Sequence, residues 1–279
     1  MKVAVTGATG FIGRHVIAEL EARSVEPIAV VRSLTEKTSV LTGSRVIQLD
    51  LHNPLSDAFE SMGRPDVLIH LAWSGLPNYK SLHHFEHELP AQYRFLKDLV
   101  QSGLQTLVVA GTCFEYGMQS GSLSEDIEPH PINPYGFAKN VLRTQLEYLK
   151  AAYPFQLVWA RLFYLYGSGQ SESSLLPQLR QAVERGDQVF NMSGGEQLRD
   201  YLPVDEVAKH IVSLALAKKN TGTVNVCSGI PISVRRLVEG WVKENGWSIR
   251  LNLGHYPYPD YEPMAFWGDR TKLDHILNS

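Results

Sequence analysis

The chain has 279 residues, of which 26 are basic and 29 acidic, so its formal net charge is −3. This length predicts about two structural units, and 44% hydrophobic with 20% charged residues is an ordinary globular composition. The near balance of charges provides no general field for nucleic acid or anionic lipid, and no apolar run reaches the ~20 residues of a membrane span. Two cysteines cannot build a disulfide framework, so we expect a soluble cytoplasmic protein that binds neither nucleic acid nor membrane.

Short apolar runs alternate with amphipathic stretches along most of the chain, which is the pattern of strand, crossover helix and parallel strand. The apolar runs are nearly continuous, as in parallel strands that are covered on both faces. They predict strands at Lys2–Thr6, Pro27–Val31, Val46–Leu49, Val67–Leu71, Thr106–Ala110 and Gln156–Ala160. The amphipathic stretches predict helices at Phe11–Glu21, Phe85–Ser102 and Pro134–Ala152, the last with Asn133 as its N-cap.

After Gly167 the pattern loosens, and helices near Ser174–Glu184 and Asp205–Ala217 alternate with short strands and turn residues. We therefore expect an α/β fold with a doubly wound parallel sheet and a smaller C-terminal part. The boundaries are 1–167 for a dinucleotide-binding domain, which receives returning segments from the C-terminal part, and 168–279 for a mainly substrate-binding part. A cleft between two such bodies is a usual place for a ligand.

The first predicted strand runs into the sequence TGATGFIGRH, which places three glycines at a strand-to-helix turn. Glycine lets the backbone approach a phosphate closely, and the helix N-terminus offers unpaired N–H groups and the positive end of a dipole. The loop therefore predicts a Rossmann-type dinucleotide site, although a tight turn without a ligand is the alternative. The expected cofactor contacts in this loop are Gly7, Gly10, Phe11, Ile12 and Gly13.

The GxxGxxG spacing resembles the short-chain dehydrogenase/reductase superfamily, in its extended branch that modifies nucleotide sugars. The resemblance implies that Asp50 and Leu51, after the third strand, hold the adenine. It also implies that Leu71 and Ala72, at the end of the fourth strand, line the cofactor. Asp50 could equally be an ordinary turn carboxylate.

The second predicted strand ends Val30-Val31-Arg32-Ser33, without the carboxylate that holds the ribose hydroxyls in NAD sites. Arg32 could instead pair with a 2′-phosphate, with Arg14 as a helper, because a guanidinium matches phosphate oxygens. We therefore expect NADP as the cofactor, with NAD as the alternative if Arg32 only points to solvent.

Tyr135 and Lys139 are four residues apart on a predicted helix, hence on one face. A phenol with a pKa near 10 is a poor acid–base catalyst at neutral pH unless a nearby cation lowers that pKa. The resemblance assigns Tyr135 as the acid–base group and Lys139 as that cation. It also implies that the Thr112 hydroxyl, in the segment GTCFEYG, bonds to the reacting oxygen.

Cys113 and Phe114 stand where sugar dehydratases of this family carry an Asp-Glu pair, which argues against dehydration. Glu115 comes one place later and is expected to face elsewhere. Cys113 lacks an accompanying His or Asn arrangement, so we expect a buried thiol and not a nucleophile.

On the substrate side, Tyr164 occupies the Asn position of the family segment RxxNxYG, which puts the usual sugar contact in doubt. The stretch RDYLPVDEVA resembles a family segment in which an arginine grips the substrate diphosphate, and Arg199 holds that position; pairing with Asp200 or Asp205 is the alternative. Trp73 could stack on the sugar or base, or pack.

His83, His84 and His87 fall in one predicted helix, and an exposed face is expected there and not a metal site, since ligand spacing with a carboxylate or cysteine is missing. The segment RLFYLYG and the C-terminal tail PYPDYEPMAFWGD most resemble nucleotide-sugar 4-ketoreductases. Such enzymes would use NADPH to reduce C4 of a nucleotide-linked 4-keto-6-deoxy sugar. A 4-epimerase and a non-catalytic dinucleotide-binding regulatory protein are the alternatives. The resemblance also implies a homodimer.

Overall fold

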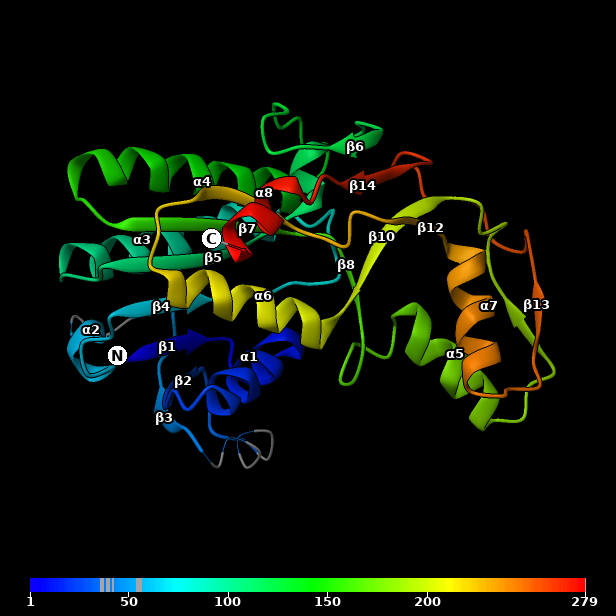
Figure 1. Cartoon of the computed structure of the whole chain (residues 1–279), viewed down its shortest axis with the longest axis horizontal. Coiled ribbons are helices and arrows are strands. Elements are labelled where there is room, and N and C mark those ends of the chain that lie inside the picture. Colours follow the sequence, from blue (N-terminus) through cyan, green and yellow to red (C-terminus); the bar gives the residue numbers. More distant parts are fainter. Residues whose placement is uncertain (36–37, 39–40, 42, 54–56, 279) are drawn as a thin grey trace.

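A seven-stranded parallel sheet forms the centre of the molecule in this computed structural model, which describes residues 1–35, 38, 41, 43–53 and 57–278 (Figure 1). The strand order is β11-β7-β5-β4-β1-β2-β3. The strands are β1 Val3–Thr6, β2 Pro27–Val31, β3 Arg45–Gln48, β4 Val67–His70, β5 Thr106–Thr112, β7 Gln156–Leu162 and β11 Gly222–Val226. The chain winds outward from β1 in one direction and from β4 in the other, which leaves a crevice at the carboxyl ends between them. The predicted doubly wound α/β fold is thus confirmed.

Helices cover both faces of this sheet. One face carries α1 Phe11–Ala22 and α6 Val204–Ala217, with α8 Thr271–Leu277 beside them, and the other carries α2 Ala58–Ser61, α3 Leu89–Gln101 and α4 Pro134–Ala152. Side chains alternate between the two cores along a strand, so Val3 and Val5 pack under α1 and α6, whereas Ala4 packs on the opposite face. Burial on both faces explains why the strands read as continuous apolar runs.

Two predicted elements differ from the structure. The third strand was expected to be buried, but β3 is half exposed, because it lies at the edge of the sheet and pairs with β2. The helix expected at 85–102 opens as a π-helical turn, η2 His84–Glu88, before α3 begins at Leu89. Pro90 follows directly and has no N–H to donate, so the regular helical hydrogen-bond pattern is interrupted there.

A smaller lobe lies beside the sheet (Figure 1). It contains α5 Leu175–Glu184, α7 Val234–Glu244 and the paired strands β9 Val189–Asn191 and β13 Arg250–Asn252, around an apolar core of its own. A three-stranded sheet joins the lobe to the body and consists of β8 Tyr164–Tyr166, β10 Leu198–Pro203 and β12 Pro231–Ser233. Residues after 167 therefore belong to both bodies, because α6 and β11 return to the large sheet.

The last segment of the chain crosses back to the large body. Here β14 Phe266–Gly268 pairs with β6 Gly121–Leu123, and both strands share an apolar cluster with the short 3-10 helix η3 Cys113–Tyr116. A small apolar cluster that includes Cys113, Phe163 and Phe266 fills the space between them. Across the described ranges, none of the helices has the length and apolar character that crossing a bilayer requires.

Candidate active site

A cavity of about 850 Å³ lies where the carboxyl end of β5 faces the smaller lobe. Residues from β5, α4, β8, α5 and α7 line it, so both bodies of the molecule form its walls. The structure brings together five predicted site residues on these walls: Trp73, Thr112, Tyr135, Lys139 and Tyr164. The predicted cofactor residues Phe11, Ile12 and Leu71 also line this cavity.

A second cavity of about 390 Å³ continues from the first toward β2 and β3. Trp73 and Leu76 line both cavities, so the two spaces adjoin. The other predicted cofactor residues on its walls are Gly7, Gly10, Arg32, Asp50, Leu51 and Ala72. Together the two cavities connect the glycine loop and the carboxyl ends of β2 and β3 with the wall that carries Tyr135 and Lys139.

The glycine loop is built for close backbone packing. The Gly10 N–H bonds to Gly7 O at 2.9 Å, and a Cβ at Gly13 would lie only 2.1 Å from Gly7 O, so Gly13 must lack a side chain even though it lines neither cavity. Gly10 is the N-cap of α1 and supplies no side-chain cap. The first N–H groups of α1 thus remain available to an anion, which is what a pyrophosphate requires.

Lys139 reaches from α4 to the end of β5. Its Nζ donates a hydrogen bond to Ala110 O at 2.9 Å and lies 4.0 Å from the centroid of the Trp73 ring. Burial lowers the pKa of Lys139 to about 7, while the carboxylates of Glu115 and Glu88 act in the opposite direction. The ring face of Trp73 favours the charged form as well.

Tyr135 lies one helical turn before Lys139, on the same face of α4, and its ring is buried. Burial raises the pKa of the Tyr135 phenol well above its ordinary value, and the hydrogen bond with Thr112 acts against that increase. The pKa is therefore not lowered, as was expected from the nearby Lys139, because burial outweighs the other causes. The phenol is therefore protonated at neutral pH, which is the form that can donate a proton.

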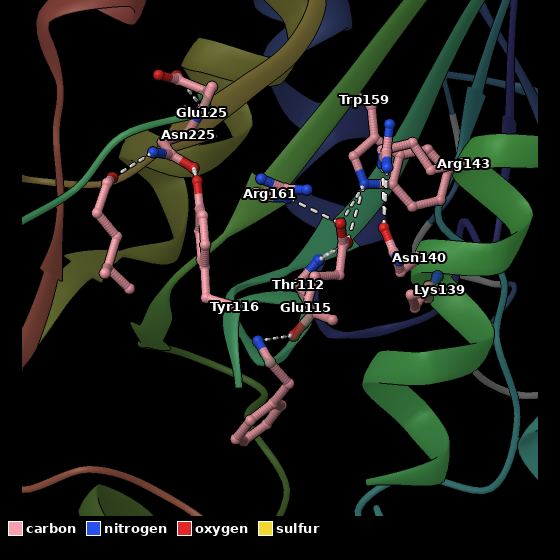
Figure 2. A network of polar contacts seen from close by, with 12 residues as sticks. Thr112, Glu115, Tyr116, Glu125, Lys139, Asn140, Arg143, Trp159, Arg161 and Asn225 are labelled. Atoms are coloured by element: carbon pink, nitrogen blue, oxygen red, sulfur yellow. Dashed lines mark hydrogen bonds and ion pairs between the residues drawn. The ribbon is translucent and has the colours of Figure 1, made fainter. Parts of the chain in front are cut away.

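Thr112 begins the helix η3 as its N-cap, in a reciprocal capping box. Its Oγ1 accepts the Phe114 N–H at 3.3 Å, and the Glu115 carboxylate accepts the Thr112 N–H at 2.9 Å (Figure 2). Glu115 is fully buried and points away from the cavity, as expected from its position in the sequence. Cys113 is also buried, and burial raises the pKa of its thiol, which disfavours the thiolate form that a nucleophile requires.

The two residues expected at the adenosine end differ in their surroundings. Arg32 is exposed at the rim of the smaller cavity. Asp50 accepts the His52 N–H at 3.1 Å, and this hydrogen bond lowers the pKa of its carboxyl group, so it serves as a turn carboxylate while also lining the cavity. Arg14, the expected helper of Arg32, bonds to Gly169 O at 3.3 Å and lines neither cavity.

Arg199 lines neither cavity and is only 2% exposed. Its Nη2 forms a 2.7 Å ion pair with Glu262, and the guanidinium lies 4.7 Å from the Phe266 ring centroid and 5.8 Å from that of Tyr164. Its acidic partner is therefore not Asp200 or Asp205, as the alternative interpretation proposed.

His84 corrects the expectation of an exposed histidine face. It is fully buried, accepts the Trp73 Nε1–H on Nδ1 at 3.1 Å, and contacts Asn78 O through Nε2 at 2.8 Å. The buried carboxylate of Glu88 bonds to Ser74 and to His52. Within the described residues, no group of three or more His, Cys, Asp or Glu side chains could hold a metal ion.

Sequence reasoning missed the aromatic wall next to Tyr135. The rings of Tyr79 and Phe114 have centroids 4.8 Å apart, and Tyr261 from the C-terminal tail packs against both. All three line the larger cavity. Tyr79 lies in a loop without a recognisable motif. The signal in the sequence was the high content of aromatic residues in the C-terminal segment 256–267.

The site combines the glycine loop with Tyr135, Lys139 and Thr112 on a doubly wound sheet. This combination defines a dinucleotide-binding protein of the extended short-chain dehydrogenase/reductase type. Residues 3–227 match the NAD dependent epimerase/dehydratase family, and the chain belongs to this family.

Several relatives and solved structures resemble most or all of the chain. The dTDP-6-deoxy-L-talose 4-dehydrogenase (NAD(+)) of Aggregatibacter actinomycetemcomitans is 28% identical over 270 residues, which cover 96% of this chain and 99% of the relative. The UDP-glucose 4-epimerase of Streptococcus mutans is 28% identical over 276 residues, covering 89% of this chain and 83% of the relative. The structure of MoeE5 in complex with UDP-glucuronic acid and NAD is 28% identical with a TM-score of 0.83, and the match covers 100% of this chain and 93% of that one.

Proposed function

We propose that the protein reduces the C4 ketone of a nucleotide-linked 4-keto-6-deoxy sugar, with NADPH as the preferred cofactor and NADH as the alternative. The observation that carries this proposal is that Thr112, Tyr135 and Lys139 line the larger cavity together with Phe11 and Ile12 of the glycine loop. The similarity to a 4-dehydrogenase of a 6-deoxy sugar supports it, because dehydrogenation is the same reaction in reverse.

The dinucleotide, when bound, supplies or accepts the hydride. Gly7, Gly10 and Gly13 would hold its pyrophosphate at the start of α1, and Arg32 would meet a 2′-phosphate. On the substrate side, Trp73 and Tyr164 would contact the sugar nucleotide, since both line the larger cavity.

Tyr135 donates the proton to the C4 oxygen as the alcohol forms. Burial keeps its phenol protonated until then. The phenolate that remains is stabilised by the ammonium of Lys139. The Thr112 hydroxyl bonds to the same oxygen and orients the carbonyl.

A 4-epimerase is the second candidate, supported by the similarity to UDP-glucose 4-epimerase. The same three residues would then oxidise C4 and reduce it again on the other face, without net consumption of cofactor.

One experiment separates the candidates. The purified protein is mixed with NADPH or NADH and a panel of nucleotide-linked 4-keto-6-deoxy sugars, while the absorbance of the reduced nicotinamide is followed. Stoichiometric oxidation is expected, and the Tyr135→Phe variant serves as the control. Interconversion of sugar epimers without net oxidation would favour the epimerase, and cofactor binding without turnover of any sugar would favour a regulatory protein.

We also propose a homodimer that pairs α3 and α4 with their counterparts. The exposed side chains of Phe137 and Tyr148 on α4, 47% and 77% accessible, are compatible with such a contact. Analytical ultracentrifugation at micromolar concentration should show the dimer mass, and a monomer there would contradict this proposal.

A further inference from the structure

We infer that Glu115 is a positioning residue, whose buried carboxylate holds the backbone turn that directs the Thr112 hydroxyl into the larger cavity. The inference rests on the proposed function, in which Thr112 contacts the reacting oxygen. Glu115 itself lies behind the cavity wall and does not line it.

The Glu115 carboxylate collects three donors that come from different parts of the fold (Figure 2). It accepts the Thr112 N–H at 2.9 Å, the Trp159 Nε1–H at 2.9 Å and the Arg161 Nε–H at 2.8 Å. Trp159 and Arg161 both lie on β7, next to β5, and both are at most 1% exposed. The carboxylate therefore ties the end of β5 and the start of η3 to a buried, rigid strand.

The neighbouring backbone leaves room for this arrangement. A Cβ at Gly111 would lie 2.3 Å from Trp159 Nε1 and 2.7 Å from Glu115 Oε1, so only glycine fits directly before Thr112. Arg161 neutralises the buried charge of Glu115, and its guanidinium lies 4.5 Å from the centroid of the Tyr116 ring. A buried charge without such a partner would be strongly destabilising.

The consequence for Thr112 concerns the direction of its hydroxyl. Oγ1 accepts the Phe114 N–H, so the hydroxyl proton is left to be donated elsewhere, and the cavity side offers Tyr135. Both halves of the capping box depend on the same turn. If the bond from the Thr112 N–H to Glu115 is weakened, the turn is released and the hydroxyl loses its fixed orientation.

A double-mutant cycle between Glu115→Gln and Thr112→Ala tests the inference with the full-length protein, the cofactor and the sugar that gives the highest turnover. Glu115→Gln keeps the shape and removes the charge. We expect it to lower kcat about 10-fold in the wild-type background and less than about 2-fold in the Thr112→Ala background, with the Kd of the cofactor unchanged. Equal losses in both backgrounds would show that Glu115 is merely structural and would overturn the inference.

Glu125→Gln is the matched control, because Glu125 also accepts a backbone N–H, that of Asn225 at 2.7 Å, in the same network but away from Thr112. We expect its effect on kcat to be the same with and without Thr112. If Glu115→Gln does not fold, Trp159→Phe removes one donor and keeps the ion pair, and it should show a smaller loss of about 3-fold that also disappears with Thr112→Ala.

A crystal structure of Glu115→Gln separates this inference from the proposed function. If the wild type reduces none of the sugars, the proposed function fails, but the position of the hydroxyl can still be measured. Displacement of Thr112 Oγ1 by about 1 Å or more supports the positioning role, since errors of that size matter in active sites. An unchanged Thr112 overturns it.

Discussion

The wall of the larger cavity and the rim of the smaller cavity use polar residues in opposite ways. On the wall, Thr112 and Lys139 are at most 6% exposed and each forms hydrogen bonds with the backbone or with buried side chains. Behind Tyr164, Arg199 is equally buried and paired with Glu262. On the rim, Arg32 extends into solvent just after β2.

Burial sets how much a single charged side chain contributes to stability or binding. In a buried setting the effective dielectric is low, so the loss of a charged partner lowers the free energy of unfolding by several kcal/mol. Salt changes this loss little. At an exposed site the same charge is screened, and a typical ion pair is worth about 0–1 kcal/mol. The effect of replacing these residues on stability, turnover or cofactor preference should therefore increase with their burial.

Replacement of Arg199 by Met should have the largest effect on stability. It leaves the buried carboxylate of Glu262 without its partner, and we expect the free energy of unfolding to fall by about 3–5 kcal/mol. Arg235→Met is the matched control, because Arg235 forms an ion pair with Glu239 in which both side chains are about half exposed, and a loss of about 0–1 kcal/mol is expected. Urea denaturation measures the free energy of unfolding of both variants. Equal losses would show that burial does not determine the contribution of these ion pairs.

Replacement of Tyr135 by Phe removes only the transferable proton. We expect kcat to fall by at least about 10²-fold, the usual scale for a general acid, with cofactor affinity close to that of the wild type. Tyr148→Phe, on the same helix but 77% exposed, should leave kcat unchanged. Undiminished turnover by Tyr135→Phe would remove Tyr135 from the mechanism.

Lys139→Met tests the buried amine through the pH dependence of stability. Because burial lowers the pKa of Lys139 from 10.5 to about 7, the unfolded chain binds more protons than the folded chain between these values. Stability should therefore rise with pH across this window in the wild type, and Met cannot contribute to that rise. The stability of the wild type relative to the variant should increase by roughly 2 kcal/mol from about pH 7 to about pH 9. Parallel curves from denaturant titrations at both pH values would contradict the shift.

Arg32→Asp should have the smallest effect. If Arg32 meets a 2′-phosphate from its exposed position, the wild type should prefer NADPH over NADH by about 1 kcal/mol, or roughly 5-fold, and the preference should shrink as salt rises. The Asp variant should reverse it, since a carboxylate repels the phosphate and accepts from a ribose hydroxyl. Fluorescence titration with both cofactors measures the ratio, and equal affinities before and after the change would show that Arg32 only faces solvent.

Local sequence patterns predicted those parts of the site whose geometry is also local. Asn133 caps α4 through a 2.8 Å bond to the Gly136 N–H, and α4 has the bounds that its Pro134 start predicted. The glycine loop and the spacing of Tyr135 and Lys139 are equally short-range. Each of these depends on residues within one or two helical turns, where the backbone geometry is set by the chain itself.

The apolar and amphipathic pattern of the sequence predicted the alternating strands and helices, and from them the doubly wound sheet and a cleft between two bodies. Only the tertiary structure decided which charges are paired. Glu115 meets Arg161 46 residues later, and Arg199 meets Glu262 63 residues later. An isolated charged residue has the same appearance in the sequence whether it ends up buried or exposed. Its partner is decided when distant strands pack together, because a buried charge must find a counter-charge among the residues that the fold places beside it.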